Sequence, residues 1–217
     1  MVRKTFETSK NVKALLNMFD MVIAKYKEDI KWADKLSCKK FIYNKDDNDY
    51  PNSVRLQNFG REAHTWAYHI VKNYDLLNEY TIFVQGDPFY HFKNFIEVAQ
   101  TLPESFCFLY KYEEGLYGIA DINQPEDLDF LKSRKVRPDI VLNYISSKNK
   151  KKYVFPFAWG AQYVVHKDNI LCKPIEFWQR LVDIDYKNEE HWPWSLERCW
   201  IEIFGRDTLQ VNKKLFL

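Results

Sequence analysis

Asp87 ends a run of strand-forming residues in the stretch YTIFVQGDPFYHF, between a glycine and a proline. Gly86 lets the backbone bend tightly and Pro88 prevents the strand from continuing, so the carboxylate is presented at a sheet edge. A carboxylate in that position can bind a hard cation or a sugar hydroxyl. The alternative is a turn aspartate that accepts a hydrogen bond from its own backbone.

Two histidines are candidate partners of Asp87 in a metal site. His91 follows four residues later, and it shares a face with Asp87 if a helix begins near Pro88. His166 ends a later predicted strand and is a candidate second metal ligand. Packing is the alternative role for both, because a lone histidine is more often structural than metal-binding.

A phosphate site is predicted in the stretch NFGRE, where a long helix begins. Asn58, Gly60 and Arg61 precede or open this helix, and its unpaired N–H groups together with a guanidinium favour an anion. The alternative is an ordinary helix start with a surface pair between Arg61 and Glu62. His64 lies one turn further on and is expected to face the same cleft.

Tyr26 and Asp29 follow the first predicted strand, in the stretch YKED. An aromatic ring beside a carboxylate suits a nucleobase and its ribose. The alternative is an ordinary solvent-exposed loop. Nothing in the spacing of these two residues decides between the two roles.

Glu197 lies in the stretch PWSLERCW, among tryptophans. A carboxylate beside aromatic side chains can have a raised pKa and act as a general base. The alternative is a helix pair with Arg198. The chain has no G-x-S-x-G, P-loop, G-x-G-x-x-G or H-E-x-x-H motif, so the enzyme classes that depend on those motifs have no support.

The elements that must position these residues alternate along the chain. Strands are predicted at 19–26, 39–45, 80–85 and 161–166, and helices at 61–77, 91–102, 173–184 and 193–205. Residues 111–152 are predicted to form a long loop with a short helix. The alternation predicts an α/β fold, a mostly parallel sheet flanked by helices in a single domain covering 1–217.

In such sheets, ligands bind outside the carboxyl ends of the strands. The polar clusters YKED, NFGRE and QGDP all fall at strand ends or at a helix start. We therefore expect these clusters to converge on one rim of the sheet.

Composition limits the function classes. The chain of 217 residues has 32 basic and 30 acidic residues, for a net charge of +2, which argues against a dedicated nucleic-acid binder. No apolar stretch is long enough for a membrane span, and the first residues lack the apolar run of a secretion signal. The four cysteines are far apart and are expected to be free thiols. A cytoplasmic protein is the expectation.

Several stretches, in order, resemble an uncharacterised protein family: VIAKYKEDIKWADKL, YNK, NFGREAHTWAYHIVKNYDLLNEYTIFVQGDPFYH, WGAQYVVHKDNIL and PWSLERCWIEIF. The most specific blocks of the family read N-x-G-R-E-A-H-T and Q-G-x-P-F-x-H. The likeness covers most of the chain from Val22 to Phe204, except 111–152. Members of the family look like small glycosyltransferases of the GT-A type, with a Rossmann-like sheet.

The resemblance implies a nucleotide-sugar donor, with UDP as the default nucleotide, and a glycan or glycoprotein acceptor. A D-x-D motif would hold Mn²⁺ or Mg²⁺ against the diphosphate, but here the equivalent place reads Gln85-Gly86-Asp87, with one acid missing. Tyr26 and Asp29 would then contact the nucleoside and Arg61 the phosphates. In an inverting reaction, Glu197 would serve as the base.

Two other functions remain open from the sequence. The first is a non-catalytic module that binds nucleotide sugars or glycans, which the single acid in Gln-Gly-Asp would explain. The second is a metal-dependent phosphohydrolase or nuclease built on Asp87, Asp29 and His91. The near-neutral charge counts against the nuclease.

Overall fold

The computed structural model describes residues 18–119, 133, 135–137, 141, 158 and 160–206. The strands are β1 (Phe19–Lys25), β2 (Lys39–Asn44), β3 (Ser53–Arg55), β4 (Tyr80–Gln85), β5 (Tyr110–Glu113), β6 (Leu116–Gly118) and β7 (Tyr163–His166). The α-helices are α2 (Arg61–Asn73), α3 (Phe95–Gln100), α6 (Lys167–Leu171), α7 (Ile175–Val182), α8 (Trp192–Glu197) and α9 (Trp200–Phe204). Short 3₁₀ helices are η1 (Lys31–Lys35), η2 (Tyr74–Leu76) and η3 (Glu104–Phe108).

The strands form one seven-stranded mixed sheet in the order β3-β2-β1-β4-β7-β6-β5. Strands β3, β2, β1 and β4 pair in parallel, whereas β7, β6 and β5 join through antiparallel pairings. The prediction of an α/β fold is confirmed, but the prediction of a mostly parallel sheet is wrong. The sheet is mixed because β7 runs antiparallel to β4, and because β6 forms an antiparallel hairpin with β5.

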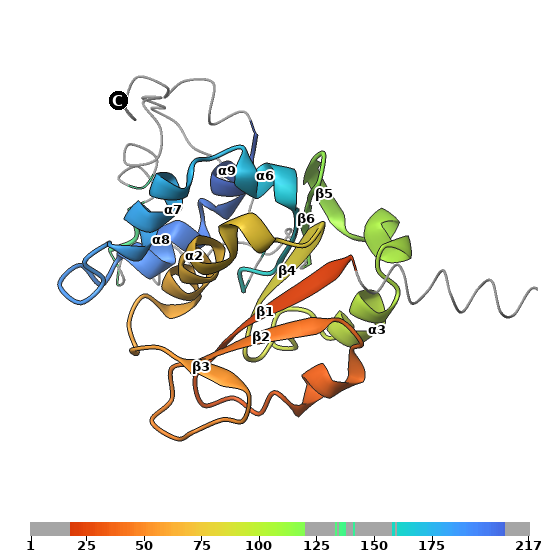
Figure 1. The fold of residues 1–217 in the computed structure, drawn as a ribbon, viewed down its shortest axis with the longest axis horizontal. Coiled ribbons are helices and arrows are strands. Elements are labelled where there is room, and N and C mark those ends of the chain that lie inside the picture. The colour runs from red at the N-terminus through yellow and green to blue at the C-terminus, as the bar shows by residue number, and fades with distance from the viewer. Residues whose placement is uncertain are drawn as a thin grey trace, which may run out of the picture.

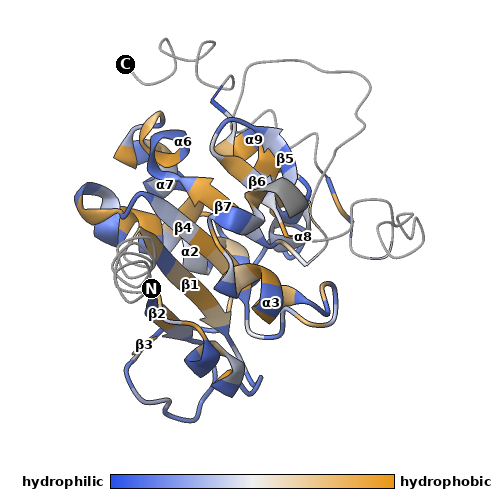
Figure 2. Ribbon diagram, turned by 90° about the vertical axis from the view of Figure 1, so that its right-hand side faces the viewer, coloured by the Kyte–Doolittle hydropathy of each residue, from blue (hydrophilic) through white to orange (hydrophobic). Residues whose placement is uncertain are grey.

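Helices cover both faces of the sheet. Figure 1 shows α2, α7, α8 and α9 on one face and α3 on the other. Apolar colouring in Figure 2 is strong along the central strands β1 and β4, which lie between these helix layers. Two clusters of buried side chains fill the two layers, one around Trp66 and Phe83 and the other around Met21 and Phe95. A central strand buried on both faces explains the continuous apolar run of β1.

Helix α2 is the element that the sequence predicts most clearly. Its apolar residues recur at intervals of three and four, and Ala63, Trp66, Ala67 and Ile70 are all fully buried. Fully burying a large apolar side chain contributes roughly 1.5–3 kcal/mol. Gly60 precedes the helix in the left-handed conformation, with φ of 65° and without a side-chain cap.

Other helices depart from prediction at their boundaries. The helix expected at 193–205 is two short helices, α8 and α9, with a break at Arg198 and Cys199. The helix expected from residue 91 begins at Phe95, after a turn in which the Phe92 N–H donates to the Pro88 carbonyl at 3.0 Å. The predicted helix at 173–184 is confirmed as α7, and Pro174 precedes it.

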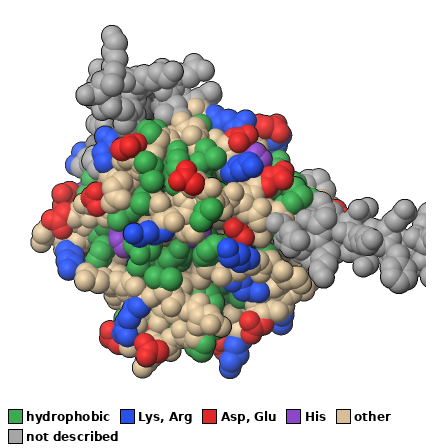
Figure 3. Space-filling view, in the orientation of Figure 1, with side chains coloured by type: hydrophobic (Ala, Val, Ile, Leu, Met, Phe, Trp, Pro, Cys, Tyr) green, Lys and Arg blue, Asp and Glu red, His purple; other side chains and the backbone are tan. Residues whose placement is uncertain are grey.

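Part of the expected loop at 111–152 is structured. Strands β5 and β6 form a hairpin there, and Gly115 supplies the left-handed turn with φ of 73°. The short helix expected further along falls mainly on residues outside the described part of the chain. On the face shown in Figure 3, basic and acidic side chains are interspersed. In the part of the chain that the structure describes, no helix is long and apolar enough to cross a membrane.

Candidate functional site

A cleft of about 370 Å³ opens at the carboxyl ends of β1, β2 and β4, beside the start of α2. Its lining residues come from those four places: Ala24, Lys25, Tyr26, Glu28, Lys45, Asn58, Arg61, Glu62 and Gln85. The structure thus brings together Tyr26, Asn58, Arg61 and Gln85, which the sequence had placed in three separate clusters. The convergence of YKED, NFGRE and QGDP follows from parallel strands ending at one rim.

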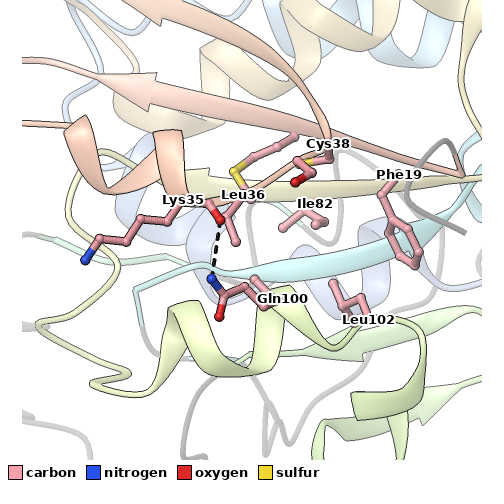
Figure 4. A pocket seen from close by; sticks show the side chains of 10 residues that line it. Phe19, Lys35, Leu36, Cys38, Ile82, Gln100 and Leu102 are labelled. Carbon is pink, nitrogen blue, oxygen red and sulfur yellow. Dashed lines mark hydrogen bonds between the residues drawn. The ribbon is translucent and has the colours of Figure 1, made fainter. Parts of the chain in front are cut away.

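A smaller pocket lies at the opposite end of β1 and β4. Figure 4 shows this pocket of about 160 Å³, with Phe19 and Ile82 from the first halves of β1 and β4 in its wall. The Gln100 amide donates to the Lys35 carbonyl across it at 3.3 Å. Its lining is separate from that of the cleft, and it holds none of the predicted site residues.

Two buried lysines line the cleft, and sequence reasoning missed both. The Lys45 side chain is buried, and its ammonium donates to the carbonyl oxygens of Phe59, at 2.6 Å, and of Arg61. Burial lowers the pKa of Lys45 to about 7, and the nearby Glu62 carboxylate opposes this shift. Lys25 is also buried, and it donates to the Tyr26 carbonyl at 2.7 Å. Each lysine lies at or just beyond the end of an apolar strand. This position is the feature of the sequence from which both lysines could have been predicted to lie at the rim of the sheet.

The start of α2 is conformationally strained. Arg61 follows the left-handed Gly60 with a positive φ of its own, 46°, which is unfavourable for a residue with a Cβ. The two Lys45 hydrogen bonds hold the carbonyls on either side of this pair. The Arg61 guanidinium lies 4.1 Å from the centre of the Trp194 ring and its Nε lies 3.5 Å from Glu62 Oε2. Because the Glu62 side chain is only 7% exposed, this is not the ordinary surface pair that the sequence left open.

Asp87 adopts the turn role that the sequence offered as its alternative. Its Oδ1 accepts a hydrogen bond from the Phe89 N–H at 3.0 Å, and the residue is exposed. The Gln85 amide donates to the Asp87 carbonyl at 3.0 Å. Gly86 leaves room for the Glu28 carboxylate, which packs against the backbone where a Cβ would lie.

The two candidate metal histidines lie at opposite ends of β4. His91 is near Asp87, whose charge opposes the lowering of the His91 pKa by burial. His166 pairs with Tyr80 at the first residue of β4, and its Nδ1 accepts the Asp168 N–H at 3.2 Å at the start of α6. The structure therefore does not bring His166 to Asp87. Among the described residues, no group of three or more His, Cys, Asp or Glu side chains fits a metal site.

Asp29 and His64 also lie apart from the cleft surface. Asp29 is exposed, and its Oδ1 accepts the Lys31 N–H at 3.0 Å at the start of η1, which matches the ordinary-loop alternative. His64 is buried, with its ring centre 4.5 Å from that of Phe59. Burial, together with the Lys45 charge, lowers the pKa of His64 to about 4, so the ring is neutral at pH 7. His64 packs beneath the start of α2 and does not line the cleft.

Glu197 forms the helix pair with Arg198 and also has a raised pKa. Its carboxylate accepts a hydrogen bond from the Arg198 guanidinium at 2.9 Å and is only 13% exposed. Burial raises the pKa of Glu197 to about 7, with Arg198 opposing the shift and Glu62 adding to it. Helix α8, which carries Glu197, packs against α2, and the Arg61 charge also acts on this carboxylate. A carboxyl group with a pKa near 7 is suited to proton transfer at neutral pH.

Residues 21–103 match the model of a protein family described as "Protein of unknown function (DUF3431)". No curated protein and no solved structure matches the chain. The matched segment contains every residue that lines the cleft, whereas Trp194 and Glu197 lie outside it. The chain is thus similar to this family across the segment that builds the cleft.

Proposed function

We propose that the protein is a glycosyltransferase that moves a sugar from a nucleotide-sugar donor to a hydroxyl group of a glycan or glycoprotein acceptor. The observation that carries the proposal is the cleft at the carboxyl ends of the parallel strands, whose lining holds three cations, Lys25, Lys45 and Arg61, beside the acids Glu28 and Glu62. Concave sites with a few convergent polar groups at this end of an α/β sheet typically bind ligands. The GT-A-like sequence blocks support a nucleotide sugar as that ligand.

The donor diphosphate is assigned to the start of α2. Arg61 can bind phosphate oxygens through its guanidinium, and the first N–H groups of a 13-residue helix favour an anion. Lys45 supplies further positive charge when it is protonated. Tyr26 is 38% exposed at the rim, where its ring can stack on a nucleobase, UDP being the nucleotide that the resemblance favours. Gln85 and Asn58 offer amides to hydroxyl groups of the donor.

The reaction exchanges one bond at the anomeric carbon of the donor sugar. The acceptor oxygen forms a bond to that carbon while the bond to the diphosphate oxygen breaks, and the diphosphate leaves with the electron pair. In an inverting reaction, Glu197 takes the proton of the attacking hydroxyl. The cations at the start of α2 stabilise the charge that develops on the leaving diphosphate.

A divalent cation remains a separate prediction. The described residues form no ready-made metal-ligand set, and the Asp87 carboxylate already accepts a backbone hydrogen bond. No step above therefore passes through a metal. Mn²⁺ or Mg²⁺ bound chiefly by the diphosphate, with Asp87 at its edge, would supply additional charge neutralisation.

The direct test is donor turnover. The protein is incubated with a panel of UDP-, GDP- and CDP-sugars, with Mn²⁺ or with EDTA, and release of the nucleoside diphosphate is measured with and without mixed glycan acceptors. The proposal expects release with one donor class, accelerated by an acceptor. Binding without release would favour the non-catalytic module. The hydrogen bond that Asp87 accepts within its turn also favours that alternative. Cleavage of a generic phosphoester without sugar preference would favour the phosphohydrolase.

A further inference from the structure

We infer that the acceptor is a neutral oligosaccharide bound in a second polar hollow, on the other side of the Arg61–Trp194 pair from the donor cleft. This hollow has a volume of about 480 Å³, and its walls include Lys187, Asn188, Glu189, Glu190, His191 and Trp194. The inference rests on the proposed function, because it assigns the second substrate of the same reaction. It concerns different residues, since the hollow and the cleft share no lining residue.

The two hollows meet at one stacked pair. Arg61 lines the donor cleft, and its guanidinium stacks at 4.1 Å on the ring of Trp194, which lines the second hollow. Glu197 follows Trp194 by three residues on the same helix, α8, and its carboxylate interacts electrostatically with Arg61 and Glu62. The base proposed above therefore lies on the helix that carries Trp194, within electrostatic reach of Arg61 and Glu62 in the donor cleft.

The walls of the second hollow are held in place by their own hydrogen bonds. Glu189 Oε2 accepts the indole N–H of Trp192 at 3.1 Å and lies 3.5 Å from His191 Nε2. The other ring nitrogen of His191 lies 3.4 Å from Ser195 Oγ. The polar groups on this wall are thus oriented before any ligand arrives, which lowers the entropic cost of binding.

The chemistry of the lining favours an uncharged, hydroxyl-rich ligand. Lys135 and Lys187 stand against Glu189 and Glu190, so neither sign of charge dominates the hollow. Carboxylates and amides accept and donate hydrogen bonds to hydroxyl groups, and an indole offers a flat apolar surface to the C–H face of a sugar ring. A phosphorylated or strongly acidic acceptor would meet as many carboxylates as ammonium groups in this hollow, so it gains no net attraction there.

The test separates the two hollows by substitution. Binding of lactose, maltose, cellobiose and chitobiose is followed by saturation-transfer NMR, and binding of the nucleotide sugar is followed by calorimetry. The double variant Asn188→Ala, Glu190→Ala is expected to weaken binding of the recognised disaccharide by about tenfold or more, because two hydrogen-bonding groups are lost. Its dissociation constant for the nucleotide sugar is expected to stay within about twofold. The matched variant Gln85→Ala, in the donor cleft, should show the opposite pattern.

Each outcome decides for or against the inference. A disaccharide that binds equally well to the double variant would overturn it, as would a panel in which none binds. Equal weakening of nucleotide-sugar binding in the double variant would assign this hollow to the donor, which also overturns the inference. If no nucleotide sugar binds but a disaccharide does, and the double variant loses it, the second hollow stands while the transferase proposal fails.

Discussion

Two titratable side chains near the start of α2 have pKa values displaced toward neutrality from opposite directions. Burial lowers the pKa of Lys45 to about 7 and raises that of Glu197 to about 7. Under the proposed function, Lys45 is needed protonated for the diphosphate and Glu197 is needed deprotonated for the acceptor. We therefore expect kcat/KM to pass through a narrow, bell-shaped optimum near pH 7, measured by donor turnover between pH 5 and 9.

Glu197→Gln tests the general base. The amide keeps the shape of the side chain but cannot take a proton, so kcat should fall by about 10²–10⁴-fold while the donor dissociation constant is unchanged. The loss of activity at acidic pH should also disappear from the residual rate. Glu97→Gln on α3, an exposed acid on the other face of the sheet, serves as the control and should behave like wild type. Unchanged kcat in Glu197→Gln would remove this residue from the mechanism.

Lys45→Met tests the buried ammonium through stability as well as binding. In wild type, the folded state releases the Lys45 proton near pH 7 and the unfolded state near 10.5. The unfolded state therefore binds more protons in this window, so Lys45 makes the free energy of unfolding rise with pH from about 7 to 10.5.

The Lys45→Met variant should lose this rise and should bind the donor more weakly, which urea denaturation at several pH values and calorimetry would measure. Lys40→Met is the matched control, because Lys40 also donates to backbone carbonyls but lies away from the cleft. The same pH dependence in Lys45→Met and wild type would contradict the assignment.

At the scale of elements, local patterns predicted the long segments but missed three of the four short strands. Helix α2 carries apolar periodicity, strands β1, β2 and β4 are apolar runs of six or seven residues, and the structure confirms all four. Strands β3, β5 and β6 have only three or four residues and were missed. The direction of β7 is set by its partners in the sheet, so its own residues could not reveal an antiparallel pairing.

The candidate site also contains residues that local sequence patterns predicted and residues that they missed. Tyr26, Arg61 and Gln85 were found because each follows a strand or opens a helix, which is a local property. The burial of Lys25 and Lys45 was missed, because a lysine beside a strand end is usually solvated and only the tertiary structure buries it. His166 was misleading because the end of an antiparallel strand faces the opposite rim.

The strained start of α2 gives a prediction that reverses the usual helix propensities. Arg61 has a φ of 46°, which glycine adopts freely and alanine does not. Arg61→Gly should therefore be more stable than Arg61→Ala, by about 1 kcal/mol in urea denaturation. Both variants should lose donor binding, because both lack the guanidinium. A more stable alanine variant would show that the left-handed conformation is not retained.

Gly160 is a second backbone position that a side chain would disturb. Its φ is 72°, and a Cβ there would collide with the ring of His91. Gly160→Ala should lower the free energy of unfolding by about 1–3 kcal/mol. Asn52→Gly is the control, because Asn52 has a φ of 54° in an exposed turn and a glycine fits there without strain. Thermal denaturation would compare the two, and equal stabilities would contradict the assigned conformation of Gly160.

At the scale of the whole molecule, the parallel and antiparallel parts of the sheet contribute differently to the proposed function. The parallel strands and the start of α2 build the cleft, and they fall within residues 21–103, which match the family model. The antiparallel strand β7 leads the chain back to α7, α8 and α9 on the face that α2 covers. This return places Trp194 against Arg61. It also brings Glu197 close enough to Arg61 for their charges to interact. The donor cleft and the proposed base thus come from distant parts of the chain.

The central claim is that the cleft binds a nucleotide sugar. The measurement is thermal stabilisation by a panel of nucleotide sugars, with and without Mn²⁺, on wild type, Arg61→Gly and the Lys40→Met control. A donor at a hundred times its dissociation constant should stabilise wild type and the control by about 2.7 kcal/mol, and Arg61→Gly far less. No stabilisation by any donor under either condition, or equal stabilisation of Arg61→Gly, would contradict the account.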